Sequence, residues 1–176
     1  MSARRAICLL IGAWIGATAL VALSAVQSFR AVDLSLDRPS RLLTFEVDRH
    51  SKEAVRTLFR YQASEQNRLL FESWGLIQFG VAALLFMALL FATRSGRIPI
   101  LTSILLLILV GVMHFLVTPQ ITAGGRALDF VPQTEMAAER TRLASIHRIY
   151  SVMEGIKVVT LIGLGAWLSV RRKPGR

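Results

Sequence analysis

Cysteine is nearly absent from this chain of 176 residues, which contains only Cys8. A single cysteine excludes a disulfide scaffold and argues against a metal site built from thiolates. Three familiar catalytic patterns are absent as well: the zinc-protease helix, the nucleophile elbow and the phosphate loop. We therefore expect neither a bound metal nor enzymatic activity.

Acidic residues are scarce too, since 11 Asp and Glu stand against 21 Lys and Arg and leave a net charge of +10. In a soluble protein this balance would suggest nucleic-acid binding. Here the basic residues crowd beside apolar runs, where attraction to lipid headgroups explains them. The expected partner is the lipid bilayer, and nucleic acid is excluded.

Apolar sequence is what the chain has in quantity, because 53% of its residues are hydrophobic. Four apolar runs cover about residues 6–26, 69–92, 98–118 and 149–170. Each can cross a hydrocarbon core of about 30 Å, which takes about 20 helical residues. We predict an all-α integral membrane protein, a four-helix bundle that forms one domain over residues 1–176. The first run is longer than a typical signal-peptide core, so we expect it to remain as a span.

Basic residues without acidic neighbours flank these runs at both termini and between the second and third runs. They are Arg4, Arg5, Arg94, Arg97, Arg171, Arg172, Lys173 and Arg176. An even number of spans puts these three segments on one side of the membrane, and short segments rich in Lys and Arg stay in the cytoplasm. We predict that both termini are cytoplasmic, in the inner membrane of a bacterium.

The two other connections, residues 27–68 and 119–148, are outer loops too long to be simple turns. Pro39 breaks the first loop near its start. Apolar residues after it predict two short amphipathic helices, the second continuing into the span at residues 69–92. They are Leu42, Leu43, Phe45, Val47, Val55, Leu58 and Phe59.

Glycine and proline divide the second outer loop. Gly124, Gly125 and Pro132 predict an irregular first half. Thr134 is the expected cap of an amphipathic helix that runs without interruption into the last span. In the first span, Gly12 and Gly16 form a Gly-x-x-x-Gly pattern, which we expect to pack closely inside the bundle.

The last apolar run contains two charged residues, Glu154 and Lys157. A charge at the centre of a membrane costs at least about 2.5–3.5 kcal/mol, so it is a candidate for a functional role. At about 100° per residue, both share one helix face with residues further out. The members of this stripe are Arg140, Leu143, His147, Tyr150, Glu154 and Lys157.

The neighbouring spans place polar residues at a matching depth. Glu72 and His114 each lie about one turn inside the outer end of a span, and Gln78 lies deeper. We expect Glu72, His114 and the stripe to form one polar cluster in the outer half of the bundle. The cluster either binds a small ligand, or it only neutralises charge and fixes helix packing in an accessory subunit of a larger membrane assembly.

His114 and His147 allow an alternative of another class. They lie near the outer ends of consecutive spans, where paired axial ligands of a haem could sit in a helical bundle. The alternative function is therefore a membrane redox protein that holds haem b between these two histidines. An absorption spectrum of the purified protein separates the two hypotheses.

A set of residues from the third span onward resembles a known pattern. It comprises Pro119, Arg126, Glu139, Leu143, Ile146, His147 and Tyr150, with Trp14 and Gly16 in the first span. The chain is similar here to the small membrane family built around domain of unknown function 4149, which includes animal transmembrane protein 205. In that family a basic and acidic helix leads to a histidine at the mouth of the last span, as Arg140 to His147 do here. The charged first loop and the pair of Glu154 and Lys157 depart from the family, and the resemblance implies a four-span bundle without an established activity.

Overall fold

The computed structural model describes residues 3–91, 96–132 and 134–170, and nearly all of them are helical. The elements are α1 (Ala3–Asp37), α2 (Arg41–His50), α3 (Lys52–Phe91), α4 (Arg97–Val112), the π-helical turn η1 (Met113–Val117), α5 (Thr118–Ala127) and α6 (Ala137–Val170). α4, η1 and α5 follow one another without a break and form one continuous rod.

Among the described residues, four helices are long and apolar enough to cross a membrane: α1, α3, the α4–η1–α5 rod and α6. Each contains one of the four predicted spans. The prediction of an all-α, four-helix membrane protein is therefore confirmed. The helices are also longer than a membrane requires, since the 40 residues of α3 measure about 60 Å at about 1.5 Å per residue.

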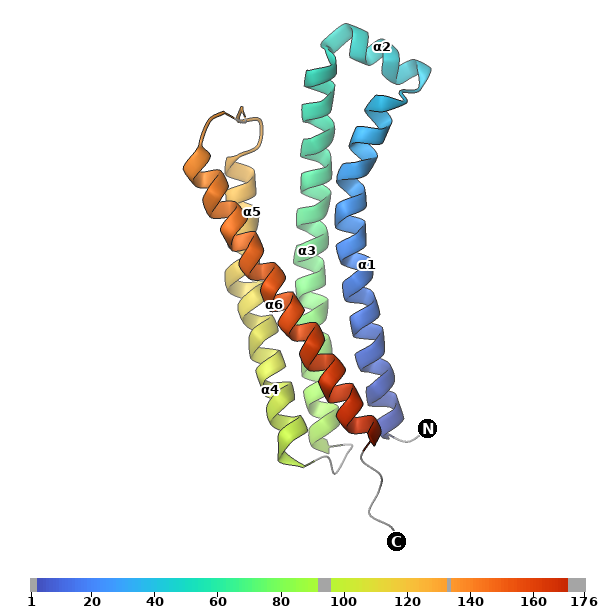
Figure 1. Ribbon diagram of the computed structural model, residues 1–176, viewed down its shortest axis with the longest axis vertical. Helices are drawn as coiled ribbons and strands as arrows, with labels where there is room; N and C mark the ends of the chain where they lie inside the picture. The colour runs from blue at the N-terminus through green and yellow to red at the C-terminus, as the bar shows by residue number, and fades with distance from the viewer. Residues whose placement is uncertain (1–2, 92–95, 133, 171–176) are drawn as a thin grey trace.

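The bundle has two distinct ends (Figure 1). The start of α1, the end of α3, the start of α4 and the end of α6 lie together at one end, which we call the terminal end. α2, the end of α5 and the start of α6 lie at the other, the loop end. Towards the loop end, α5 and α6 lean away from the hairpin of α1 and α3.

The apolar core occupies the terminal half. Buried residues of all four spanning rods meet there: Ile7, Ile11, Trp14, Trp74, Ala82, Leu85, Leu89, Leu106, Val110, Leu161, Leu164 and Leu168. A second, smaller core lies at the loop end between α1, α2 and α3, and consists of Val32, Leu36, Val55 and Ala63. This second core explains why α1 and α3 stay helical beyond the length needed to cross the membrane.

The first outer loop has the predicted break at Pro39 and a short helix after it. Ser40 caps α2, because its hydroxyl accepts a hydrogen bond of 3.4 Å from the backbone N–H of Leu43. One face of α2 packs on the small core, while Leu42 and Phe45 are 82% and 63% exposed. The second predicted helix is the start of α3, which runs unbroken into the second span as predicted.

The third rod differs from the prediction, because it continues through Gly124 and Gly125 to Ala127. The π-helical turn just before Pro119 accommodates the missing backbone N–H of that proline, and the Thr118 hydroxyl donates to the Met113 carbonyl at 2.9 Å. The two glycines admit close neighbours instead of ending the helix. A Cβ atom on Gly125 would lie 3.0 Å from Nη2 of Arg68.

The start of α6 also differs from the prediction. The helix begins at Ala137, so Thr134 lies in the preceding turn and is not its cap. The guanidinium of Arg140 supports this turn by donating to the carbonyls of Val131 at 2.9 Å and Glu135 at 3.0 Å. From Ala137 to Val170 the helix is unbroken, which confirms the predicted continuity into the last span.

Gly12 and Gly16 do not pack inside the bundle, contrary to the prediction. Both are exposed, and a Cβ atom on either would have no neighbour within 4 Å. Ile11 and Trp14 occupy the inward face of α1 instead, because burying large side chains removes more apolar surface than burying glycine. The two glycines therefore lie on the outer surface of the bundle.

Candidate functional site

The polar centre of the bundle is the pair formed by Glu154 and Lys157, one turn apart on α6. Lys157 is completely buried, and its ammonium lies 2.5 Å from Oε2 of Glu154. The carboxylate remains 17% exposed, so the pair is enclosed on the side of the lysine. A buried cation of this kind requires both a counter-charge and further hydrogen-bond partners.

Gln78 of α3 and Trp14 of α1 supply these partners. The ammonium of Lys157 donates to Oε1 of Gln78, and the indole N–H of Trp14 donates to the same oxygen at 3.3 Å. The amide N–H of Gln78 then donates to Oε1 of Glu154 at 3.3 Å. The lysine also lies 5.7 Å from the centre of the Trp14 ring, within reach of a cation–π interaction.

Tyr150 completes this group by donating its hydroxyl to Oε1 of Glu154 at 3.3 Å. We call Trp14, Gln78, Tyr150, Glu154 and Lys157 the inner cluster. It joins α1, α3 and α6 about 20 Å from the terminal end of α6. Its polar groups are engaged with one another, and the apolar core lies between it and the terminal end.

A second group of polar residues lies nearer the loop end, between α3 and the third rod. The Thr122 hydroxyl donates to Oε1 of Glu72 at 3.3 Å. One turn further in, the ring of His114 lies against Gly75, where a Cβ atom would be 2.5 Å from Nδ1. That Nδ1 is buried without a hydrogen-bond partner in the described part of the chain. We call Glu72, His114 and Thr122 the outer group.

His114 belongs to η1, the π-helical turn. Such turns are rare and occur frequently at functional sites. His114 contacts Gly75 and Thr122 contacts Glu72, so both residues face α3. The outer group is therefore a polar seam between two spanning rods, and it contains one carboxylate and one unpaired imidazole nitrogen.

An ion network joins α3 to the end of α5 at the loop end of this seam. The guanidinium of Arg68 forms two parallel hydrogen bonds with the carboxylate of Asp129, at 2.8 and 2.9 Å, and also pairs with Glu65. Arg126 binds the same glutamate through two contacts of 3.3 Å. Hydrogen bonds from Arg126 and Arg68 lower the pKa of the Glu65 carboxyl. We call Glu65, Arg68, Arg126 and Asp129 the rim network.

The residues predicted to form one cluster are thus divided between separate groups. Tyr150, Glu154 and Lys157 meet as the stripe predicts. Glu72 of α3 contacts α5, and His114 of η1 contacts α3. Neither residue forms a hydrogen bond with α6 among the described residues.

The outer part of the stripe does not reach the cluster. Arg140 is held by the carbonyls of the turn before α6. His147 is exposed, although helix periodicity aligns it with Glu154. The reason is that the first part of α6 leans away from α1 and α3, so these helices do not cover the face of α6 that carries His147.

Haem b between His114 and His147 stays a prediction. In this structure the ring of His114 lies against α3 and His147 is exposed, so both side chains would have to turn to share an iron. Among the described residues, no three His, Cys, Asp or Glu side chains are grouped closely enough to hold a metal ion. The geometry does not favour the haem hypothesis over ligand binding.

Sequence reasoning missed Trp14, Thr122 and the rim network as contributors to the polar groups. A buried indole N–H usually needs a partner, which could have drawn attention to Trp14. The helical spacing of Glu65, Arg68 and Glu72 places them on one face of α3, but their partners come from distant sequence. No local signal could have paired them.

No protein-family model matches this chain, and no similar curated protein or solved structure was found. The similarity to the family of domain of unknown function 4149 therefore stays a prediction.

Proposed function

We propose that this protein is a non-enzymatic membrane protein that binds a small monovalent cation at the outer group. The observation that carries this proposal is the hydrogen bond between Thr122 and Glu72, about one turn outside the buried, unpaired Nδ1 of His114. A carboxylate, a hydroxyl and an imidazole offer oxygen and nitrogen lone pairs to a cation. One carboxylate balances one positive charge, which favours a monovalent ligand.

The position of the outer group supports access from the loop end. Glu72 lies about 28 Å from the end of α3 at Phe91, near the far boundary of a hydrocarbon core of about 30 Å. A cation would therefore reach it without crossing most of the membrane.

The inner cluster lies deeper in the bundle than the proposed site and does not itself bind the ligand. Lys157 already neutralises Glu154, and Gln78 and Tyr150 use the remaining acceptor of that carboxylate. A ligand at this depth would have to displace a buried lysine, whereas Glu72 forms no ion pair with a Lys or Arg side chain among the described residues. Ligand binding at Glu72 therefore has a lower free-energy cost than ligand binding at Glu154.

Thermal unfolding of the purified full-length protein in a neutral detergent tests the proposal. Sodium chloride and methylammonium chloride are each compared with N-methylglucamine chloride, a bulky cation, at equal ionic strength. We expect one of the small cations to raise the melting temperature, because a ligand at about 100 times its Kd stabilises the folded state by about 2.7 kcal/mol. The comparison of sodium with methylammonium shows whether the ligand is a metal ion or an amine.

Substitutions identify the site. Glu72→Gln removes the charge with little change of shape and should abolish the response to the cation. Glu53→Gln is the matched control, since Glu53 lies exposed on the same helix. Equal melting temperatures in all three salts, or a Glu72→Gln variant that responds like the wild type, would refute the proposal.

A further inference from the structure

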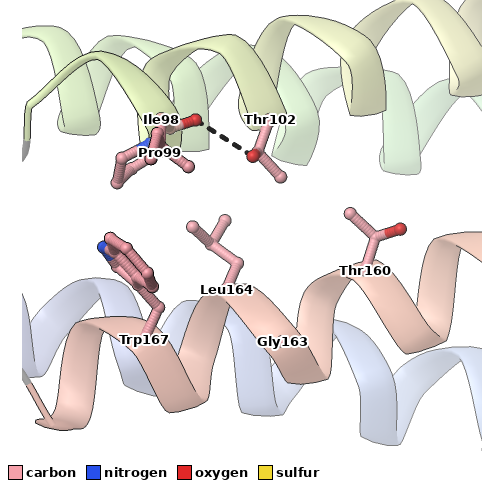
Figure 2. Close-up of a pocket in the computed structure, with 7 residues that line it drawn as sticks. All are labelled: Ile98, Pro99, Thr102, Thr160, Gly163, Leu164 and Trp167. Atoms are coloured by element: carbon pink, nitrogen blue, oxygen red, sulfur yellow. Dashed lines mark hydrogen bonds between the residues drawn. The ribbon is translucent and has the colours of Figure 1, made fainter.

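A groove lies between α4 and α6 in the terminal half of the bundle, on the other side of the inner cluster from the outer group. It has a volume of about 220 Å³ and is lined by Ile98, Pro99, Thr102, Thr160, Gly163, Leu164 and Trp167. Figure 2 shows Trp167, Leu164 and Thr160 projecting from α6 towards α4. From Thr160 to Trp167 the groove extends about 10 Å along the helix.

The chemistry of this lining suits hydrocarbon. Its two hydroxyls are used within their own helices, because Thr102 donates to the Ile98 carbonyl at 3.0 Å and Thr160 donates to the Ile156 carbonyl at 2.7 Å. The first of these bonds is visible in Figure 2. A water molecule needs two to four polar partners to occupy a cavity, and this lining offers too few. Because α4 and α6 are membrane spans, the molecules outside the groove are lipid chains.

Charge at the mouth of the groove indicates the kind of lipid. Arg97 begins α4, directly before two of the lining residues, and it is exposed. On this side of the inner cluster, the described residues of the four rods include the basic residues Arg4, Arg5 and Arg97 and no Asp or Glu. Trp167, at the same end, is of the residue type that is enriched at the level of lipid headgroups.

We propose that the groove binds one acyl chain of an anionic phospholipid from the adjacent leaflet, with the headgroup phosphate beside Arg97. The apolar lining holds the chain, and the guanidinium attracts the phosphate and any further negative charge. The site is separate from the outer group and does not depend on the cation proposed to bind there. A zwitterionic lipid with the same chains would occupy the groove more weakly, since its headgroup carries no net charge.

Native mass spectrometry of the full-length protein tests this, with phosphatidylglycerol and phosphatidylcholine of identical acyl chains as the two probes. We expect more phosphatidylglycerol to remain bound. Arg97→Gln should reduce this preference about fivefold, which corresponds to the loss of about 1 kcal/mol for one basic residue at an anionic surface. Binding of the acyl chain in the groove should not change, because the side chain of Arg97 is exposed.

Gly163→Leu tests the groove itself, because a Cβ atom at Gly163 has no neighbour within 4 Å and a leucine can fill the space. We expect it to lower retention of both lipids. Gly155→Leu is the matched control on the same helix. A Cβ atom at Gly155 also has no neighbour within 4 Å, and Gly155 does not line the groove.

Three results would overturn the proposal. Equal retention of the two lipids by the wild type would show that the protein does not select an anionic headgroup. Equal effects of Gly163→Leu and Gly155→Leu would show that the lipid does not bind in the groove. Should Gly163→Leu fail to fold, an Arg97→Gln variant that keeps the full preference for phosphatidylglycerol would still refute the assignment.

Discussion

Lys157 and Glu154 show how a membrane interior makes charged side chains dependent on one another. Lys157 has no contact with solvent, and its hydrogen-bond partners are supplied by α3 and by its own helix. Glu154 differs, since it is partly exposed and accepts hydrogen bonds from Gln78 and Tyr150 as well. The two partners should therefore not be equally costly to remove.

We expect Glu154→Gln and Lys157→Met each to destabilise the protein by about 3–5 kcal/mol, because each leaves a buried charge unpaired. Glu154→Gln should be the worse of the two, since it strands a fully buried ammonium. The double variant should lose less than the sum of the single losses. Melting temperatures in detergent measure all three, and additive losses would show that the residues do not compensate each other.

Whole helices are held together at the loop end by the rim network. Arg68 of α3 binds Asp129, which follows α5, and Arg126 of α5 binds Glu65 of α3. Gly125 permits the close approach of the Arg68 guanidinium, and Gly124 permits that of Leu143, so both glycines serve contacts between helices. These bonds fix the third rod against α3 above the outer group.

The rim network should make stability depend on pH. Hydrogen bonds from Arg126 and Arg68 lower the pKa of Glu65 in the folded protein, so the stabilisation is fully present above its unfolded pKa of about 4.3. It is lost as the pH falls through the lower, folded pKa. In thermal unfolding between neutral and acidic pH, the advantage of the wild type over Glu65→Gln should shrink below about pH 4.3. The exposed Glu53→Gln variant provides the baseline, and a pH-independent difference would contradict this role of Glu65.

The molecule as a whole is a bundle that is tightly packed at one end and more open at the other. The terminal half contains a large apolar core, whereas towards the loop end α6 leans away from α1 and α3, and the rim network joins α5 to α3. Both described ends of the chain lie at the compact end, together with Arg4, Arg5 and Arg97. The other basic residues of the topology prediction, Arg94, Arg171, Arg172, Lys173 and Arg176, lie outside the described residues. The two ends of the bundle therefore differ in charge and packing, and they should face opposite sides of the membrane.

We predict that the terminal end faces the cytoplasm, because short Lys- and Arg-rich flanks are retained there. A fluorescent cytoplasmic reporter fused after Arg176 should be active. A periplasmic-type phosphatase inserted at Ser40, between α1 and α2, should be active as well. Phosphatase activity after Arg176 would reverse the orientation.

Local sequence was sufficient to predict the four spans and the continuity of α3 and α6, because hydrophobic runs and helical periodicity depend on neighbouring residues. The pairing of Glu154 with Lys157 was predictable for the same reason, since residues three apart meet on one helix face. Ser40 and Pro39 likewise mark the break before α2 through their own backbone preferences.

Contacts between helices could not be read in this way. Leu143 and Arg68 approach the helical Gly124 and Gly125 from other helices, and a glycine does not encode its neighbours. His147 shares the periodicity of Glu154 but loses its cover because α6 diverges from α1 and α3. Trp14 and Gln78 join the inner cluster across more than 60 positions of sequence. Which polar residues meet is set by the angles at which the helices pack, and these angles depend on side chains from every helix at once.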